Sequence, residues 1–359
     1  CALMTNQNPS PYCGIISCRD PNFIKSSIPT DRLFPMKATG KFLMVLASFC
    51  SIFGLSGIWA GEEILPRPDH RVSYGPAQLV GRMADARLVE CSGMDVSLTA
   101  GNFLWAINDG GHGSFIYALG LDGRSLGRVA VLGAQNRDWE GLDTFFWQGR
   151  PMILIADFGD NKQVHDAHTL YIVEEPRLKG QRYSESAAVD VAWRIVFSYP
   201  DSKHDAEGVA VDALEGKVFV LTKRDNPPLL FEVPLKPSSS KIPVVARKVA
   251  AVTRIPPPTR EDLRQKYGLF RSQPTALDFS SDRRHAVVLT YKHAYIFHRS
   301  RFESWESAFS QNPMLIPLPL PQDRSDLRQR EAICFSPSGK SLFISSEGKG
   351  AGLFLLKAR

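Results

Sequence analysis

The sequence predicts an all-β fold, a five-bladed β-propeller closed by an N-terminal strand. A short pattern recurs along the chain, in which an oxygen-bearing residue is followed by a small residue and then by an apolar one. Two further apolar runs follow each occurrence, which gives three expected strands per unit. The last unit lacks a fourth run, whereas the segment 72–83 precedes the first unit without a partner. We therefore expect that segment to complete the last blade and close the ring.

The pattern begins at five positions, which we call the opening residues: Ser92, Glu140, Glu207, Thr275 and Glu331. The second apolar runs are 103–107, 153–156, 218–222, 286–290 and 342–345. The third runs are 115–119, 169–173, 229–233, 294–298 and 352–356. Fourth strands are expected in 128–132, 189–199, 247–255 and within 302–318. The alternative is a six-bladed propeller, with a degenerate unit in 174–203 or 236–273. Otherwise 236–271 is an insertion, either solvated or serving as a lid or partner surface.

The first 60 residues are expected to lie outside the folded domain. Residues 36–60 have a basic start, an apolar run and a small residue before Gly61, as in a secretory signal peptide. Residues 1–35 have no periodic pattern, and we interpret them as upstream sequence from a mis-set start. The expected domain is 61–359, a single propeller that is secreted or periplasmic and does not span a membrane after signal removal.

Charge and cysteine content narrow the function further. Without residues 1–60, 38 basic and 35 acidic residues remain, and the basic ones are scattered. No nucleic-acid partner is therefore expected. Only Cys91 and Cys334 remain in this part of the chain. Their offset of four residues along neighbouring strands is about 13 Å, too far for a disulfide, so we expect two buried thiols.

The opening residues predict a metal site. They begin the innermost strands, and the second strands return antiparallel, so both polar ends face one mouth. Three carboxylates converging there would repel one another without a cation. Oxygen ligands favour a hard cation, and Ca²⁺ accepts six to eight of them in flexible geometry. We therefore predict Ca²⁺ bound by Ser92, Glu140, Glu207, Thr275 and Glu331. The alternative is that the glutamates bind loop amides and no metal.

Residues at the second-strand ends predict an anion site beside the cation. Lys223, Arg224, Lys292, Asn161 and Glu347 are the candidate substrate-binding residues. Basic groups beside a metal suit a phosphate or a carboxylate.

Three residues are candidates for acid–base catalysis: Asp157, Asp109 and His112. The two aspartates could act as a base toward water, and His112 lies in a glycine-rich loop on the same face. The alternative is that these side chains pair with one another across loops. The sequence contains no phosphate-binding loop, no zinc-protease motif and no Gly-x-Ser-x-Gly motif.

Two resemblances support this interpretation. The stretches 138–141, 156–161, 205–208, 274–276 and 330–333 resemble a group of secreted bacterial propeller proteins of unassigned activity. More distantly, the order Ser, Glu, Glu, Thr, Glu is similar to that of the calcium-activated nucleotidases, or apyrases. That resemblance implies a central calcium at the opening residues and cleavage of a phosphoanhydride. The chain departs from those enzymes at Gly93, where they have an acidic residue, and at 157–161, where they have a glycine-rich turn.

Two functions follow as hypotheses. The first is an exported calcium-dependent hydrolase of a phosphorylated or ester-bearing small molecule. The second is a non-enzymatic calcium-stabilised propeller that binds a ligand, a glycan or an envelope protein. The substrate, the partner and the oligomeric state do not follow from the sequence.

Overall fold

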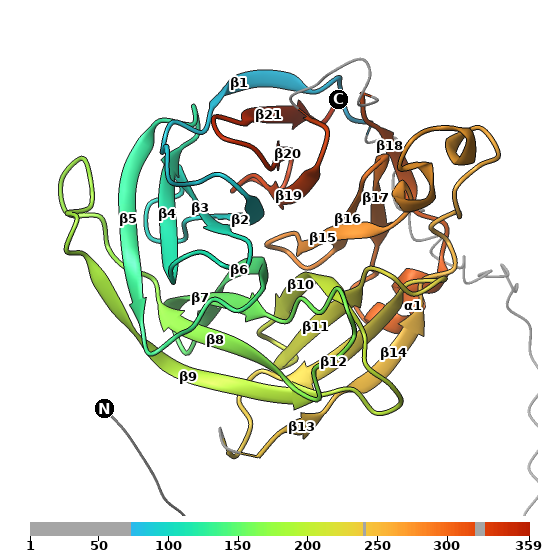
Figure 1. Ribbon diagram of the computed structural model, residues 1–359, viewed down its shortest axis with the longest axis horizontal. Helices are drawn as coiled ribbons and strands as arrows, with labels where there is room; N and C mark the ends of the chain where they lie inside the picture. Colours follow the sequence, from blue (N-terminus) through green and yellow to red (C-terminus); the bar gives the residue numbers. More distant parts are fainter. Residues whose placement is uncertain (1–72, 240–241, 320–326) are drawn as a thin grey trace, which may run out of the picture. The chain divides into compact units, whose positions relative to one another are not determined.

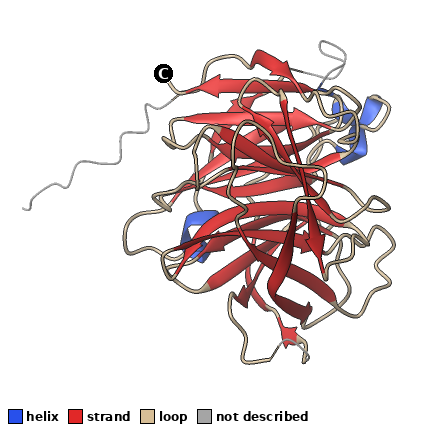
Figure 2. Cartoon of the chain, turned by 90° about the vertical axis from the view of Figure 1, so that its left-hand side faces the viewer, coloured by secondary structure: helices blue, strands red, loops and turns tan. Residues whose placement is uncertain are grey.

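The computed structural model describes residues 73–239, 242–319 and 327–359. The signal peptide and upstream segment predicted in 1–60 lie outside the described residues. Within the described ranges, none of the helices has the length and apolar character needed to cross a membrane. The fold is all-β, as predicted, and its strands surround a common centre (Figure 1). Figure 2 shows the same strands from the side, with few helical segments among them.

The strands form antiparallel groups of four, counted from the centre outward. Group 1 contains β2 (Cys91–Val96), β3 (Phe103–Asn108), β4 (Phe115–Gly120) and β5 (Ser125–Leu132). Group 2 contains β6 (Trp139–Trp147), β7 (Arg150–Asp157), β8 (His168–Glu174) and β9 (Ala188–Ser198). Group 3 contains β10 (Ala206–Asp212), β11 (Lys217–Thr222), β12 (Leu229–Pro234) and β14 (Arg247–Ala251). Group 4 contains β15 (Pro274–Phe279), β16 (His285–Thr290), β17 (His293–His298) and β18 (Met314–Pro317). Group 5 contains β19 (Arg330–Phe335), β20 (Ser341–Ser346), β21 (Gly352–Lys357) and β1 (Gln78–Arg82).

The fourth strand of group 5 comes from the N-terminal side of the domain. β1 pairs antiparallel with β21, with Gln78 opposite Leu355 and Arg82 opposite Gly352. An isolated bridge between Tyr74 and Ala358 extends the contact. This pairing confirms that the segment 72–83 supplies the strand that the last unit lacks.

Hydrogen bonding does not keep the groups fully separate. β9 is 11 residues long. It pairs with β8 through its later residues and in parallel with β5 through Ala188–Asp190. A short strand, β13 (Val244–Val245), adds to β9 in parallel. Groups 1 and 2 therefore share a nine-stranded sheet, because one long outer strand bridges both.

The two stretches that could contain a sixth unit differ from each other. The stretch 174–203 contains β9 after an irregular segment. The stretch 236–273 contains β13, β14 and two 3-10 helices, η1 (Asp262–Arg264) and η2 (Gly268–Phe270). An α-helix, α1 (Trp305–Ser310), leads from β17 to β18.

The recurring sequence pattern has a structural cause in the innermost strands. In every group the ladder between the first two strands shifts register at the opening residue, so that residue sits on a β-bulge. The next residue is small because adjacent inner strands approach closely there. A Cβ on Gly141 would lie 2.7 Å from Cγ1 of Val209, and one on Gly208 would lie 2.9 Å from Cβ of Leu277. The third residue is apolar because it packs between sheets.

Three aspartates form a second layer along the inner strands, three residues after an opening residue: Asp95, Asp143 and Asp278. Each accepts a backbone N–H from the inner strand of the next group. Asp95 accepts from Thr144 at 2.7 Å, Asp278 accepts from Phe335 at 2.7 Å, and Asp143 accepts from Val211. These contacts link consecutive groups at the centre of the fold.

Apolar side chains fill the space between neighbouring groups. Between groups 2 and 3, for example, Leu154 and Phe197 pack with Val220 and Phe231, and all four are fully buried. Burial of such a side chain contributes roughly 1.5–3 kcal/mol. The predicted thiols belong to this interior, because Cys91 and Cys334 are both buried and free, as expected.

Candidate functional site

The three glutamates among the opening residues line one pocket. The inner strands contact one another in the order β2, β6, β10, β15, β19 and back to β2. Glu140, Glu207 and Glu331 are each at most 4% exposed, and all three line a pocket of about 810 Å³. We call it the mouth pocket. Its walls also include Asp109, Asn161, Lys223, Arg224, Gln265, Lys266, Tyr267, Phe270, Arg271, Gln273, Tyr291, Arg328, Gln329 and Glu347.

The two hydroxyl-bearing opening residues have a different role. Ser92 donates its hydroxyl proton to the backbone carbonyl of Trp139 at 2.6 Å. Thr275 does the same to the carbonyl of Arg330 at 2.8 Å. In both cases the acceptor is the residue before the next opening glutamate. These hydroxyls tie adjacent inner strands together, and neither residue lines the mouth pocket.

A lysine supplies positive charge between two of the glutamates. The ammonium of Lys223 contacts the carboxylate of Glu207 and lies 4.0 Å from that of Glu331. Glu331 also accepts a hydrogen bond from the Tyr291 hydroxyl. The sequence analysis predicted that Lys223 binds an anionic substrate. In the structure its ammonium group lies near the carboxylates of two opening residues, Glu207 and Glu331.

Glu140 is in a different electrostatic position. It is 3% exposed, and no described residue forms a hydrogen bond or ion pair with its carboxylate. Burial, followed by the nearby charge of Asp109, raises the pKa of Glu140 well above its usual range. One oxygen each of Asp109, Asp138 and Glu140 lie within 4.8 Å of one another. The sequence had identified Glu140 and Asp109 but not Asp138.

Two of the three candidate catalytic residues lie outside the lining of the mouth pocket. Asp157 is buried, and one of its oxygens accepts the backbone N–H groups of Asp138 at 2.8 Å and Arg137 at 3.2 Å. It therefore fixes the loop before β6. His112 pairs with Glu90, with 2.7 Å between Nε2 and the carboxylate. Asp109 alone of the three lines the pocket.

Of the candidate substrate-binding residues, some line the mouth pocket and one does not. Arg224 lines the pocket, where it contacts Asn161 and forms an ion pair with Asp205 at 2.7 Å. Glu347 lines it as well. Burial and the adjacent Glu331 carboxyl raise the pKa of Glu347 to about 9. Lys292 is absent from the lining.

Lys292 instead anchors the insertion that carries η1 and η2. Its ammonium lies 2.7 Å from the carboxylate of Asp262, which is only 3% exposed. Asp262 also accepts hydrogen bonds from Arg271 at 3.2 Å and from the backbone N–H of Thr259 at 2.9 Å. These contacts fix the insertion at the edge of the mouth pocket. Its pocket residues Lys266, Tyr267, Phe270 and Arg271 were not identified from the sequence.

We expect the replacement Asp262→Ala to release this insertion. Loss of a buried, charge-assisted hydrogen-bond acceptor costs about 1.5–3 kcal/mol, which corresponds to roughly 10- to 100-fold more local opening. Limited trypsin digestion should therefore cleave faster after Arg260, Arg264 or Lys266. Asp166→Ala is the control, because Asp166 pairs with Lys203 at an exposed position far along the chain. Equal cleavage of both variants would show that Asp262 does not hold the insertion.

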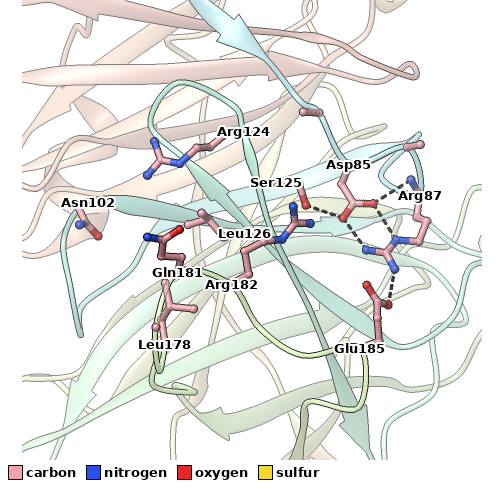
Figure 3. A pocket seen from close by; sticks show the side chains of 13 residues that line it. Asp85, Arg87, Asn102, Arg124, Ser125, Leu126, Leu178, Gln181, Arg182 and Glu185 are labelled. Carbon is pink, nitrogen blue, oxygen red and sulfur yellow. Dashed lines mark hydrogen bonds and ion pairs between the residues drawn. The ribbon is translucent and has the colours of Figure 1, made fainter.

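A second pocket lies away from the mouth, between the loop after β1, the turn before β5 and the segment before β9 (Figure 3). The carboxylate of Asp85 accepts hydrogen bonds from Arg87 at 2.8 Å and from the Ser125 hydroxyl at 2.9 Å. Arg87 also contacts Glu185 at 2.7 Å. This network joins three segments, and its charges are paired with one another.

The mouth pocket offers oxygen atoms that could bind the predicted calcium ion. The donors are oxygens, Glu140 has no partner, and Oε2 of Glu207 is buried without a hydrogen bond. These features fit a hard cation. Lys223 partly meets the need for positive charge at Glu207 and Glu331. Among the three glutamates, Glu140 is therefore the one that most lacks a positively charged partner.

Comparisons with known proteins do not place the chain in a family. Neither a family model nor a curated protein matches it. Among solved structures, the PQQ-bound aldose sugar dehydrogenase from Streptomyces coelicolor is 10% identical, with a TM-score of 0.41 over 82% of this chain and 100% of that one. The luciferin-regenerating enzyme is 8% identical, with a TM-score of 0.39 over 76% of this chain and 94% of that one. Because both TM-scores are below 0.5, these likenesses assign no function to this chain.

Proposed function

We propose that the chain is an exported five-bladed β-propeller whose mouth pocket binds a calcium ion together with a small anionic ligand. The blade count is inferred from the four-strand groups and their five bulged inner strands. The export is inferred from the signal-like segment 36–60. The observation that carries the proposal is the buried, unpartnered carboxylate of Glu140 in a pocket that also contains basic side chains.

The proposed reaction is hydrolysis of a phosphorylated or ester-bearing small molecule. Arg224 lines the pocket with one guanidinium nitrogen paired to Asp205, which fixes its position for an anionic oxygen. Lys266 and Arg328 add positive charge to the same wall. The bound cation would supply further stabilisation of negative charge as it develops.

The second candidate is binding without turnover, to a ligand, a glycan or an envelope protein. A specific observation favours it: Asp157 and His112, two of the predicted catalytic residues, do not line the pocket. Turnover of generic phosphoesters with calcium, compared with turnover in excess chelator, distinguishes the two candidates. Calcium-dependent turnover supports the hydrolase, and calcium binding without turnover supports the binding protein.

The calcium proposal is tested by titrating the protein with calcium beside the variant Glu140→Gln. We expect about one ion per chain and a raised melting temperature in the wild type. The variant should bind at least about tenfold more weakly, because affinity depends on the number of charged ligands. Calorimetry and thermal melting measure both quantities. Asp190→Asn, at an exposed strand position, is the control. An unchanged wild-type melt without heat of binding would remove calcium from the proposal.

A further inference from the structure

The mouth pocket contains a cluster of three carboxylates that lies to one side of the ring of opening residues. Asp109 follows β3, Asp138 immediately precedes β6, and Glu140 lies on the β6 bulge. One oxygen of each lies within 4.8 Å of the other two. Ligand oxygens about 2.4 Å from one Ca²⁺ ion stand up to roughly 4.8 Å apart, so this spacing matches a shared ion.

We propose that the bound cation is held off the central axis by Asp109, Asp138 and Glu140. This inference rests on the proposed calcium binding, and it replaces the ring of five opening residues with a different ligand set. Asp109 then acts as a ligand and is no longer a candidate base.

The lack of any partner at Glu140 is the first argument. Glu140 is only 3% exposed, yet no described side chain or backbone group donates a hydrogen bond to its carboxylate. No basic side chain in the described ranges forms an ion pair with any of the three carboxylates. A buried carboxylate without a partner costs several kcal/mol, so a cation placed here would remove a penalty that the more distant charge of Lys223 offsets only in part.

The axial position is less suited to a cation. Lys223 already lies between Glu207 and Glu331, and Glu331 accepts from Tyr291. Ser92 and Thr275, which donate their hydroxyl protons to backbone carbonyls, do not line the mouth pocket. An ion on the axis would have to displace an ammonium group from two of its ligands. An ion beside Glu140 displaces no basic group.

The backbone around Asp138 leaves space for its carboxylate. A Cβ on Gly110 would lie 2.5 Å from Oδ1 of Asp138, and one on Gly159 would lie 2.5 Å from Oδ2. The Asp138 carboxylate therefore fits between Gly110 and Gly159 only because neither residue has a side chain. Asp157 fixes the backbone of Asp138 by accepting its N–H at 2.8 Å. This arrangement orients the carboxylate before a ligand arrives.

The cluster leaves coordination positions open toward the pocket. One oxygen from each of the three carboxylates gives three ligands, fewer than the six to eight that Ca²⁺ accepts. Asp109 and Glu140 line the pocket, as does Arg224. An anionic ligand in the pocket could therefore contact the cation on one side and basic side chains on the other.

The test compares calcium affinity in two acid-to-amide variants of the full chain, Asp138→Asn and Glu331→Gln. Each replaces one carboxyl group near the pocket with an amide of the same size. We expect Asp138→Asn to weaken calcium binding at least tenfold more than Glu331→Gln does. Melting in chelator establishes that both variants are folded. A third variant, Thr275→Val, removes the hydroxyl group of one opening residue without changing the charge. It should bind calcium like the wild type.

A second readout uses terbium as a luminescent substitute for calcium. Trp139 lies between two of the proposed ligands in the sequence, so excitation of tryptophan should sensitise a bound terbium ion. Calcium should displace it in the wild type, and Asp138→Asn should lose the signal. If Glu331→Gln and Thr275→Val lose calcium affinity while Asp138→Asn keeps it, the ion is bound by the five opening residues at the centre of the fold. The off-axis site is then wrong, whereas the proposed calcium binding of the mouth pocket stands. If the wild type binds neither ion, both proposals are wrong.

Discussion

Raising the pH from about 4 to about 7 is expected to reduce the free energy of unfolding by about 2 kcal/mol through the buried Asp95 carboxyl. Burial raises the pKa of Asp95 to about 6, from 3.8. Each unit of difference between folded and unfolded states corresponds to about 1.36 kcal/mol. Because the folded-state pKa is the higher one, the folded protein retains the proton longer. The stabilisation is present below about pH 4 and is lost as the pH rises through 6.

The groups that face Asp95 account for this behaviour. Asp143 and Asp278 lie within the same 4.8 Å cluster, and burial raises the pKa of both well above the usual range. Asp143 shares a hydrogen bond with Asp95, which requires a proton on one of them. Cys334 also faces the three aspartates, and burial raises the pKa of its thiol. No basic side chain in the described ranges forms an ion pair with these three carboxylates.

The variant Asp143→Asn should flatten this pH dependence. Its amide N–H can donate to Asp95 in place of the shared proton, and its carbonyl can still accept from Val211. Urea unfolding at pH 4.5, 6 and 7.5 measures the difference between variant and wild type, in which contributions from other groups cancel. Asp190→Asn should follow the wild-type curve. Parallel curves for wild type and Asp143→Asn would show that the aspartate layer does not titrate in this range.

The fold could be predicted because its geometry imposes residue types on a few positions. The bulge at each opening position and the close approach of the next residue require an oxygen-bearing residue, a small residue and an apolar one in sequence. The same regularity contained the aspartate layer, since Asp95, Asp143 and Asp278 all stand three residues after an opening position. The prediction from the polar strand ends did not include these aspartates, because they lie three residues further along the inner strands than the residues at the mouth.

The candidate site was less predictable, because it depends on side-chain direction and on contacts between distant segments. The position of Lys223 at the end of β11 indicates that it faces the mouth, but not that its ammonium lies between Glu207 and Glu331. Nothing local distinguishes Asp138 from other acids that precede strands. Similarly, the pairing of Asp262 with Lys292 joins segments 30 residues apart, and it decides where the insertion lies. Such contacts arise only when the groups pack around one centre.

Replacing Gly208 with valine is expected to destabilise the fold by about 3 kcal/mol, because an added side chain overpacks the contact between inner strands. A Cβ at this position would lie 2.9 Å from Cβ of Leu277 and 3.0 Å from Cβ of Leu221. Both are Cβ atoms, which a change of rotamer cannot move, so the strands themselves must separate. For a domain of this size the melting temperature should fall by roughly 6–12 °C. Ala188→Val, at an exposed position of β9, is the control and should change the melting temperature by less than about 2 °C. A loss in Gly208→Val no larger than in the control would mean that the inner strands can separate freely, and that close approach does not explain the small residue in the recurring pattern.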